Sequence, residues 1–102
     1  AEQTQVADKD GAISITNGTV IITKADAAAL TLAAPAAGDN YKILKIVATT
    51  AKAHKITFDE GKINGGTNTK LTLGGAIGDA ATIIAYGTVW YTLALINGTV
   101  AA

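Results

Sequence analysis

Apolar and polar residues alternate along much of the chain with a period of two, which is the period of a β-strand. The alternating runs are short and are separated by turn residues roughly every ten positions, a spacing typical of a β-sandwich, jelly roll or barrel. We therefore predict an all-β domain with about eight short strands and no substantial helix. The predicted strands lie at residues 13–15, 20–22, 30–32, 41–47, 54–58, 70–73, 81–86 and 89–96.

The alanine-rich segment 25–37 is the place where this pattern competes with helix propensity, because alanine is the best helix former. Within it Leu30, Thr31 and Leu32 alternate with a period of two. Pro35 follows, and its ring prevents a helix from continuing through it. We therefore predict a strand in this segment rather than a helix.

Turn residues predict how neighbouring strands connect. Asn17-Gly18 lies between two β-branched runs and is typical of a type I′ hairpin, in which both turn residues take positive φ. The same interpretation covers Asn97-Gly98, and Gly87-Thr88 predicts a tight hairpin between the last two long strands. Residues 61–68 hold three glycines and two asparagines, so we predict a flexible loop there.

The first eleven residues differ from the rest of the chain. They are mostly polar and end in the turn-like sequence Asp8-Lys9-Asp10-Gly11, with Val6 as their one large apolar residue. We predict a polar N-terminal arm at residues 1–11 and a single β domain at residues 12–102. A disordered tail and a first strand of the domain are the alternatives for the arm.

Several predicted strands carry adjacent aliphatic residues, so that both faces of the strand are apolar. Loops at the ends of a sandwich or a symmetric oligomer would cover the second face, and the number of adjacent pairs favours the oligomer. The pairs are Val20-Ile21-Ile22, Ile43-Leu44, Ile46-Val47, Ile83-Ile84 and Leu95-Ile96.

Trp90 and Tyr91 form the one aromatic cluster visible in the sequence. Since alternate residues of a strand face opposite ways, one ring is predicted to enter the core and the other to face outward. The outward ring is either a sheet-surface residue or part of a subunit interface, where tyrosine and tryptophan are enriched.

Charge excludes several classes of partner. Eight lysines balance eight acidic residues, arginine is absent, and no segment concentrates basic residues. Nothing therefore attracts a nucleic-acid backbone or an anionic membrane surface, and the apolar runs are too short to cross a bilayer. Cysteine is also absent, so the fold has no disulfide and no thiolate metal site.

Candidate catalytic groups are few. His54 and Ser14 are the sole histidine and serine, and Ser14 lies between isoleucines without the turn that exposes a nucleophile. Asp59 and Glu60 are adjacent at a strand end, where neighbouring side chains diverge.

Two loops resemble ligand-binding motifs only in part. Residues 8–11 lack the further acidic ligands of a calcium loop, and residues 61–67 lack the ending of a phosphate-binding loop. We predict that the protein is not an enzyme and that it has no catalytic residue, no cofactor and no metal.

A series of turn and core positions resembles the small β-rich head decoration (cement) proteins of tailed bacteriophages. The resemblance spans roughly residues 28 to 96 and lies in Leu30-Thr31-Leu32-Ala33-Ala34-Pro35, Gly38-Asp39, Ile46-Val47-Ala48-Thr49-Thr50, Ala53-His54, the segment from Gly78 to Tyr86, and Trp90-Tyr91. It implies a homotrimer on the outer surface of the virion capsid, made in the host cytoplasm, that clamps neighbouring subunits of the major capsid protein.

With that partner, the N-terminal arm becomes the candidate docking element, because polar segments of this kind order when they bind. Its candidate docking residues are Glu2, Gln3, Thr4, Gln5, Val6 and Asp8. Trp90 and Tyr91 are the candidate core or subunit-interface aromatics.

Two alternatives come from other functional classes. A phage tail-fibre or receptor-binding β domain would need a ligand-binding surface with exposed aromatic residues. A carbohydrate-binding or ice-binding module is suggested by the fifteen threonines, but it would need a regular Thr-x-Thr ladder, and the chain offers only isolated instances such as residues 67–69.

Overall fold

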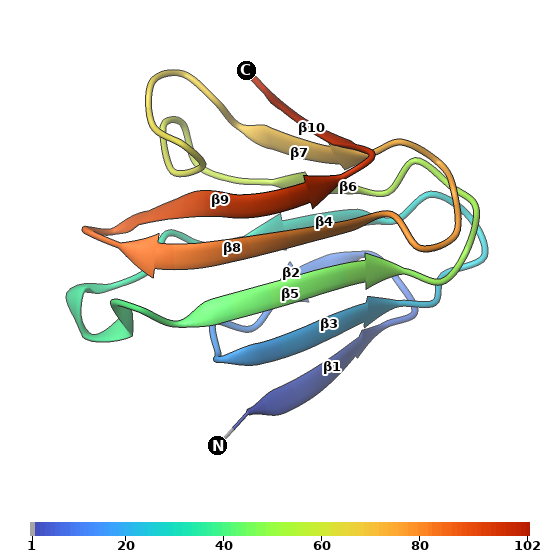
Figure 1. Cartoon of the computed structure of the whole chain (residues 1–102), viewed down its shortest axis with the longest axis horizontal. Coiled ribbons are helices and arrows are strands. Elements are labelled where there is room, and N and C mark those ends of the chain that lie inside the picture. Colours follow the sequence, from blue (N-terminus) through green and yellow to red (C-terminus); the bar gives the residue numbers. More distant parts are fainter. Residues whose placement is uncertain (1) are drawn as a thin grey trace.

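The computed structural model describes residues 2–102, whose ten strands form two five-stranded sheets packed face to face (Figure 1). The first sheet consists, in order, of β1 (Gln3–Ala7), β3 (Gly18–Ile22), β5 (Ile43–Ala48), β8 (Ala80–Tyr86) and β9 (Val89–Ile96). The second consists, in order, of β2 (Gly11–Ile13), β4 (Ala29–Leu32), β6 (Lys55–Thr57), β7 (Lys70–Leu73) and β10 (Gly98–Ala101). The predicted all-β class is confirmed.

The first six strands alternate between the two sheets, so this part of the chain winds through the sandwich as a coil. As a result β1, β3 and β5 run parallel in the first sheet, and β2, β4 and β6 run parallel in the second. The pairings that involve β7, β8, β9 and β10 are antiparallel. The architecture is therefore a mixed sandwich, whereas a jelly roll is built from antiparallel strands.

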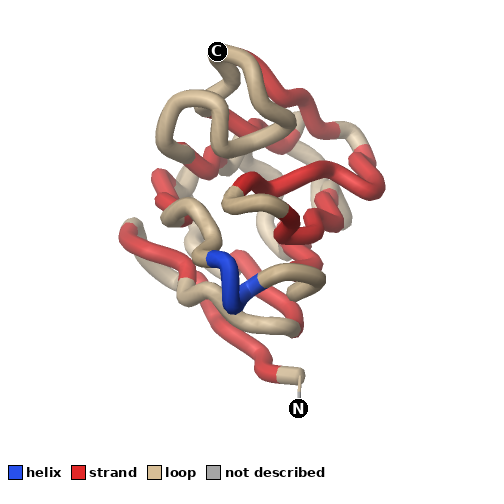
Figure 2. The backbone as a smooth tube through the Cα atoms, turned by 90° about the vertical axis from the view of Figure 1, so that its left-hand side faces the viewer, coloured by secondary structure: helices blue, strands red, loops and turns tan. Residues whose placement is uncertain are grey.

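Local structure in the alanine-rich segment agrees with the sequence. It forms β4 and then a short 3₁₀ helix, η1 (Ala37–Asp39), which is the one helical turn visible in Figure 2. The hairpin at Gly87-Thr88 is also confirmed, since Tyr86 pairs with Val89 and the two turn residues have φ of 58° and 63°.

The predicted hairpin at Asn17-Gly18 is wrong, because β2 and β3 lie in different sheets. Glycine is needed at position 18 for another reason: a Cβ atom there would lie 1.8 Å from the backbone oxygen of Gln3 in the neighbouring strand β1. The Asn17 side chain accepts a hydrogen bond from the N–H of Ile43. Asn97-Gly98 likewise links strands of different sheets, with Asn97 at φ 52°.

The prediction of a separate polar arm at residues 1–11 also needs correction. Residues 3–7 form β1, the first strand of the domain, which pairs in parallel with β3 at the edge of the first sheet. This polar strand has few apolar contacts, and hydrogen bonds of the Gln5 side chain help to hold it in place. The amide N–H of Gln5 donates to the carbonyl of Ser14, and its amide oxygen accepts from the N–H of Ser14. The sequence-level alternative of a first strand is the one observed.

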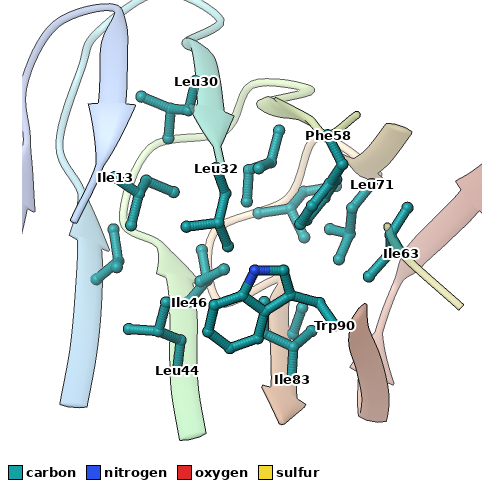
Figure 3. Close-up of a cluster of buried hydrophobic side chains, with 14 of the residues drawn as sticks. Ile13, Leu30, Leu32, Leu44, Ile46, Phe58, Ile63, Leu71, Ile83 and Trp90 are labelled. Carbon is teal, nitrogen blue, oxygen red and sulfur yellow. The ribbon is translucent and has the colours of Figure 1, made fainter. Parts of the chain in front are cut away.

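The core lies between the sheets and is centred on Trp90, which is fully buried (Figure 3). Leu44 and Ile46 of β5 and Ile83 of β8 surround its ring from the first sheet, while Leu32 of β4 approaches from the second sheet. The indole N–H donates a hydrogen bond to the carbonyl of Ala33 over 3.0 Å. This single side chain therefore ties the two layers together.

The loop at residues 61–68 is anchored rather than flexible, contrary to the sequence prediction. Ile63 is fully buried and lies alongside Trp90 as a parallel bridge. The Asn64 side chain accepts a hydrogen bond from the N–H of Thr92 in β9. The loop therefore covers the first half of the β9 edge.

Candidate functional site

The solvent side of the first sheet, called the outer face below, is crossed by a continuous row of apolar residues. The strand register places one residue from each of the five strands side by side in this row, and its two end members are each about three-fifths exposed. From β1 to β9 the row is Val6, Ile21, Val47, Ala80 and Ile96. Such a face is unusual on a monomer, since an antiparallel or mixed sandwich normally presents polar residues to water.

A second group of apolar residues continues the outer face toward its other end. Ile43, Ile84 and Tyr91 pair across β5, β8 and β9. Tyr86 lies two residues beyond Ile84 on the same face, and its ring centroid is 5.9 Å from that of Tyr41.

Tyr41, Tyr86 and Tyr91 together are called the tyrosine cluster. They are 69%, 55% and 41% exposed, and they are all the tyrosines of the chain. Tyr41 has φ of 72°, a conformation that costs free energy for a bulky residue. Tyrosine combines a large contact area with few rotatable bonds, so exposed clusters of it are typical of binding surfaces.

Between these two apolar groups runs a polar row. Thr4, Thr19, Lys45 and Thr82 lie side by side in β1, β3, β5 and β8. The Lys45 ammonium is 4.0 Å from the Glu2 carboxylate, and both side chains are more than half exposed. An exposed pair at this distance contributes little to stability, so the outer face has one weakly compensated charge among mostly uncharged residues.

The residues predicted for the site divide between the core and this face. Trp90 is in the core, and Tyr91 is on the outer face, which is the arrangement that strand alternation predicts. Of the candidate docking residues, Thr4 and Val6 share the outer face, whereas Gln3 and Gln5 pair with the inward positions Gly18 and Val20. Glu2 and Asp8 flank the strand and are exposed.

Sequence reasoning missed the Tyr41–Tyr86 pair, so the view that Trp90 and Tyr91 form the one aromatic cluster was wrong. The signal was present: Tyr41 precedes one strand and Tyr86 ends another. The two rings meet because β5 and β8 are antiparallel neighbours, which places the start of one beside the end of the other. Pairing of these strands was the missing information.

His54, which begins the strand predicted at residues 54–58, is fully buried in the turn before β6. Its Nδ1 accepts a hydrogen bond from the N–H of Ala28 over 2.9 Å, and its Nε2 lies 2.8 Å from the Thr50 hydroxyl. That hydroxyl donates to the carbonyl of Lys24. A neutral ring with its proton on Nε2 satisfies all of these partners, so His54 serves to hold three chain segments together.

Asp79 is the second buried polar residue among those described and is likewise engaged in structure. Its carboxylate accepts hydrogen bonds from the N–H of Ala76 and from the side-chain amide of Asn97. These bonds, the one from Ala76 most strongly, hold the pKa of Asp79 below its ordinary value although burial opposes this. The group fixes the corner at which the chain passes from β9 to β10.

Hollows on the described surface bring no set of reactive groups together. One hollow of about 190 Å³ lies between β1 and β2 and is lined in part by Asp8, Lys9 and Asp10. Asp10 in it is already bonded by the N–H of Ala29 and by the Lys24 ammonium, which lower its pKa. Within residues 2–102 no three His, Cys, Asp or Glu side chains are placed to hold a metal ion.

Comparisons with known proteins add no assignment: no protein-family model matches the chain, and no curated protein matches it. Over the described residues, none of the helical structure is long and apolar enough to cross a membrane.

Proposed function

We propose that this protein is a structural virion protein, a decoration (cement) protein that binds the outer surface of a phage head and stabilises contacts between major capsid subunits. The observation that carries the proposal is the outer face, with its apolar row running from one sheet edge to the other. Burial of such a row against a partner stabilises the complex by roughly 25 cal/mol for each Å² of apolar surface removed from water. The tyrosine cluster supplies aromatic anchors at one end of the same face.

Assembly as a homotrimer is part of this proposal. Several copies linked together bind a repetitive shell far more tightly than a single copy does. The zero net charge of the chain is compatible with close packing of copies, because it adds no long-range repulsion between them. The resemblance described above implies the same stoichiometry.

The test is binding of the isolated protein to phage heads that lack it, followed by co-sedimentation. Ile96→Glu places a charge in the exposed apolar row and is expected to weaken attachment by at least about tenfold. Thr31→Glu is the matched control, because Thr31 is an exposed strand position of the second sheet. Equal binding of wild type and both variants would show that the outer face is not the docking surface.

A receptor-binding or carbohydrate-binding β domain is the second candidate, and the exposed Tyr41–Tyr86 pair is the observation that favours it. Aromatic rings on a surface stack against sugar rings as readily as against protein. A glycan array probed with wild type and with Tyr41→Ala would decide. Saturable binding of one glycan that the substitution abolishes would favour this alternative, and no binding would favour the decoration protein.

A further inference from the structure

Strand β1 is an edge of the first sheet that is paired on one side only. The N–H of Gln3 donates to the carbonyl of Asn17, and the carbonyl of Ala7 accepts from the N–H of Thr23, so the odd-numbered residues point their backbone groups toward β3. Because these groups alternate along a strand, those of Thr4 and Val6 point toward the open side. None of the other described strands lies along that side.

The open edge of β1 lacks the features that normally prevent a sheet edge from pairing with another chain. Gln3 to Ala7 include no charged residue, no proline and no bulge. By contrast, the opposite edge, β9, is covered by residues 62–64 over its first half and has a register shift beside Thr82. The edge strands β2 and β10 of the second sheet have only three and four residues.

β1 is held firmly in place, so its edge is ready for pairing. The Gln5 side chain makes two hydrogen bonds to the backbone of Ser14, and Gly18 permits close contact with Gln3. A strand that is already ordered loses little conformational entropy when another strand adds to it.

We propose that β1 pairs with β1 of a second copy of this chain, antiparallel and across a twofold axis, with Val6 opposite Val6. In this register Thr4 of each copy lies opposite Asp8 of the other. Backbone hydrogen bonds then form within the Val6 pair and within both Thr4–Asp8 pairs, and they replace bonds that β1 otherwise makes to water. The Thr4 hydroxyl is placed to donate to the Asp8 carboxylate. The inference concerns the backbone edge of β1 and goes beyond the proposed docking of the outer face.

The alternation of faces and the charges select this register. Residues that pair must lie on the same face, so Val6 can oppose only even-numbered residues. A shift that places Thr4 opposite Val6 puts Glu2 against Asp8 of the second copy, a like-charge pair at each end. A shift that pairs Thr4 with Thr4 places the Glu2 charge against Val6. In the proposed register Asp10 does not meet Glu2, because its carboxylate is bonded to Ala29 and Lys24 toward the second sheet.

The twofold axis of such a pair is perpendicular to the sheet, so both outer faces point the same way. The apolar row of one copy, which ends at Val6, then continues into the row of the other. A second copy is thereby favoured over an unrelated strand, since the chain itself supplies a matching residue opposite Val6 and opposite Thr4. Twofold seams of this kind would link copies that sit side by side on one surface.

The test uses the absence of cysteine from the chain, so that one introduced thiol reports one contact. Paired residues of this type have Cα atoms about 5.5 Å apart, which suits a disulfide. In a glutathione redox buffer, Val6→Cys is expected to form disulfide-linked dimers at least about tenfold faster than Thr4→Cys, whose equivalent residues are too far apart to bridge. Ile96→Cys is the control for random collision, because Ile96 has nearly the same exposure as Val6.

Val6→Pro tests the contact without a crosslink. Proline removes an N–H that points away from β3, so circular dichroism is expected to be unchanged, while sedimentation shows loss of the species that wild type forms by twofold association. Val6→Lys, a charge on the edge, is expected to act in the same way if proline disturbs the strand.

Three results would overturn the proposal. The first is equal crosslinking of the Val6 and Ile96 variants, and the second is faster crosslinking at Thr4, which would show another register. The third is unchanged self-association of both Val6→Pro and Val6→Lys, which would show that the edge of β1 makes no contact between copies. If wild type does not bind heads at all but Val6→Cys crosslinks as described, the proposed function fails and the β1 pairing stands.

Discussion

Replacement of Trp90 tests the packing of the two sheets most severely. The side chain is fully buried, contacts residues of both layers, and bonds to Ala33. Trp90→Ala removes the largest buried side chain and is expected to cost about 3–5 kcal/mol, a large part of the roughly 5–15 kcal/mol by which a domain of this size is stable. Trp90→Phe keeps an aromatic ring but leaves the Ala33 carbonyl without its donor, which by itself costs about 1–3 kcal/mol.

The assay is guanidinium unfolding followed by far-ultraviolet circular dichroism, because Trp90 is the sole tryptophan and its fluorescence is lost in the variants. Tyr91→Ala is the control, since Tyr91 is next in sequence but lies on the outer face. Its change in unfolding free energy is expected to stay within about 1 kcal/mol. A Trp90→Ala variant as stable as Tyr91→Ala would refute the packing described here and the register of β9.

Three further outcomes are expected. Gly18→Ala forces β1 away from β3 and lowers the unfolding free energy by about 1–3 kcal/mol in denaturant titration, whereas Gly38→Ala, with no atom within 4 Å of the added carbon, has little effect; equal effects would contradict the close approach. Because the native pKa of Asp79 is lowered, its contribution to the unfolding free energy is present above about pH 4 and is lost as pH falls through the native pKa. The unfolding free energy of Asp79→Asn should therefore fall less steeply than that of wild type as the solution is acidified, and an equally steep fall would contradict this. Light scattering at micromolar concentration should give three times the mass of one chain or a multiple of it, and a monomer mass would contradict the trimer.

The all-β class and most strands could be predicted from sequence because they depend on local alternation and on turn residues. β4 is an instance: Leu30 and Leu32 are buried on one face while Thr31 is exposed, as the period of two requires. The hairpin at Gly87-Thr88 was equally accessible, since a two-residue connection between long strands leaves few other arrangements.

What sequence alone could not supply is the pairing of strands that are far apart in the chain. Asn17-Gly18 has the composition of a hairpin turn, yet the chain crosses to the other sheet there, and Gly18 is required by contact with Gln3 fifteen residues earlier. β1 was missed for a related reason, because the hydrogen bonds of its Gln5 side chain are made to Ser14, in a segment whose position depends on the whole fold.

The candidate site was only partly accessible for the same reason. Adjacent aliphatic residues indicated a second apolar face on individual strands, and Tyr91 was expected to face outward. The union of Val6, Ile21, Val47, Ala80 and Ile96 into one row depends on the register of four strand pairs. The tyrosine cluster likewise depends on the antiparallel pairing of β5 with β8.

The central claim is that the outer face of the first sheet binds a phage shell, and cryo-electron microscopy of heads carrying the protein tests it most directly. The account expects density for the sandwich on the outer capsid surface, with the row from Val6 to Ile96 and the tyrosine cluster against major capsid subunits. Density in which the second sheet meets the shell while the outer face is open to solvent, or heads without bound protein, would contradict it.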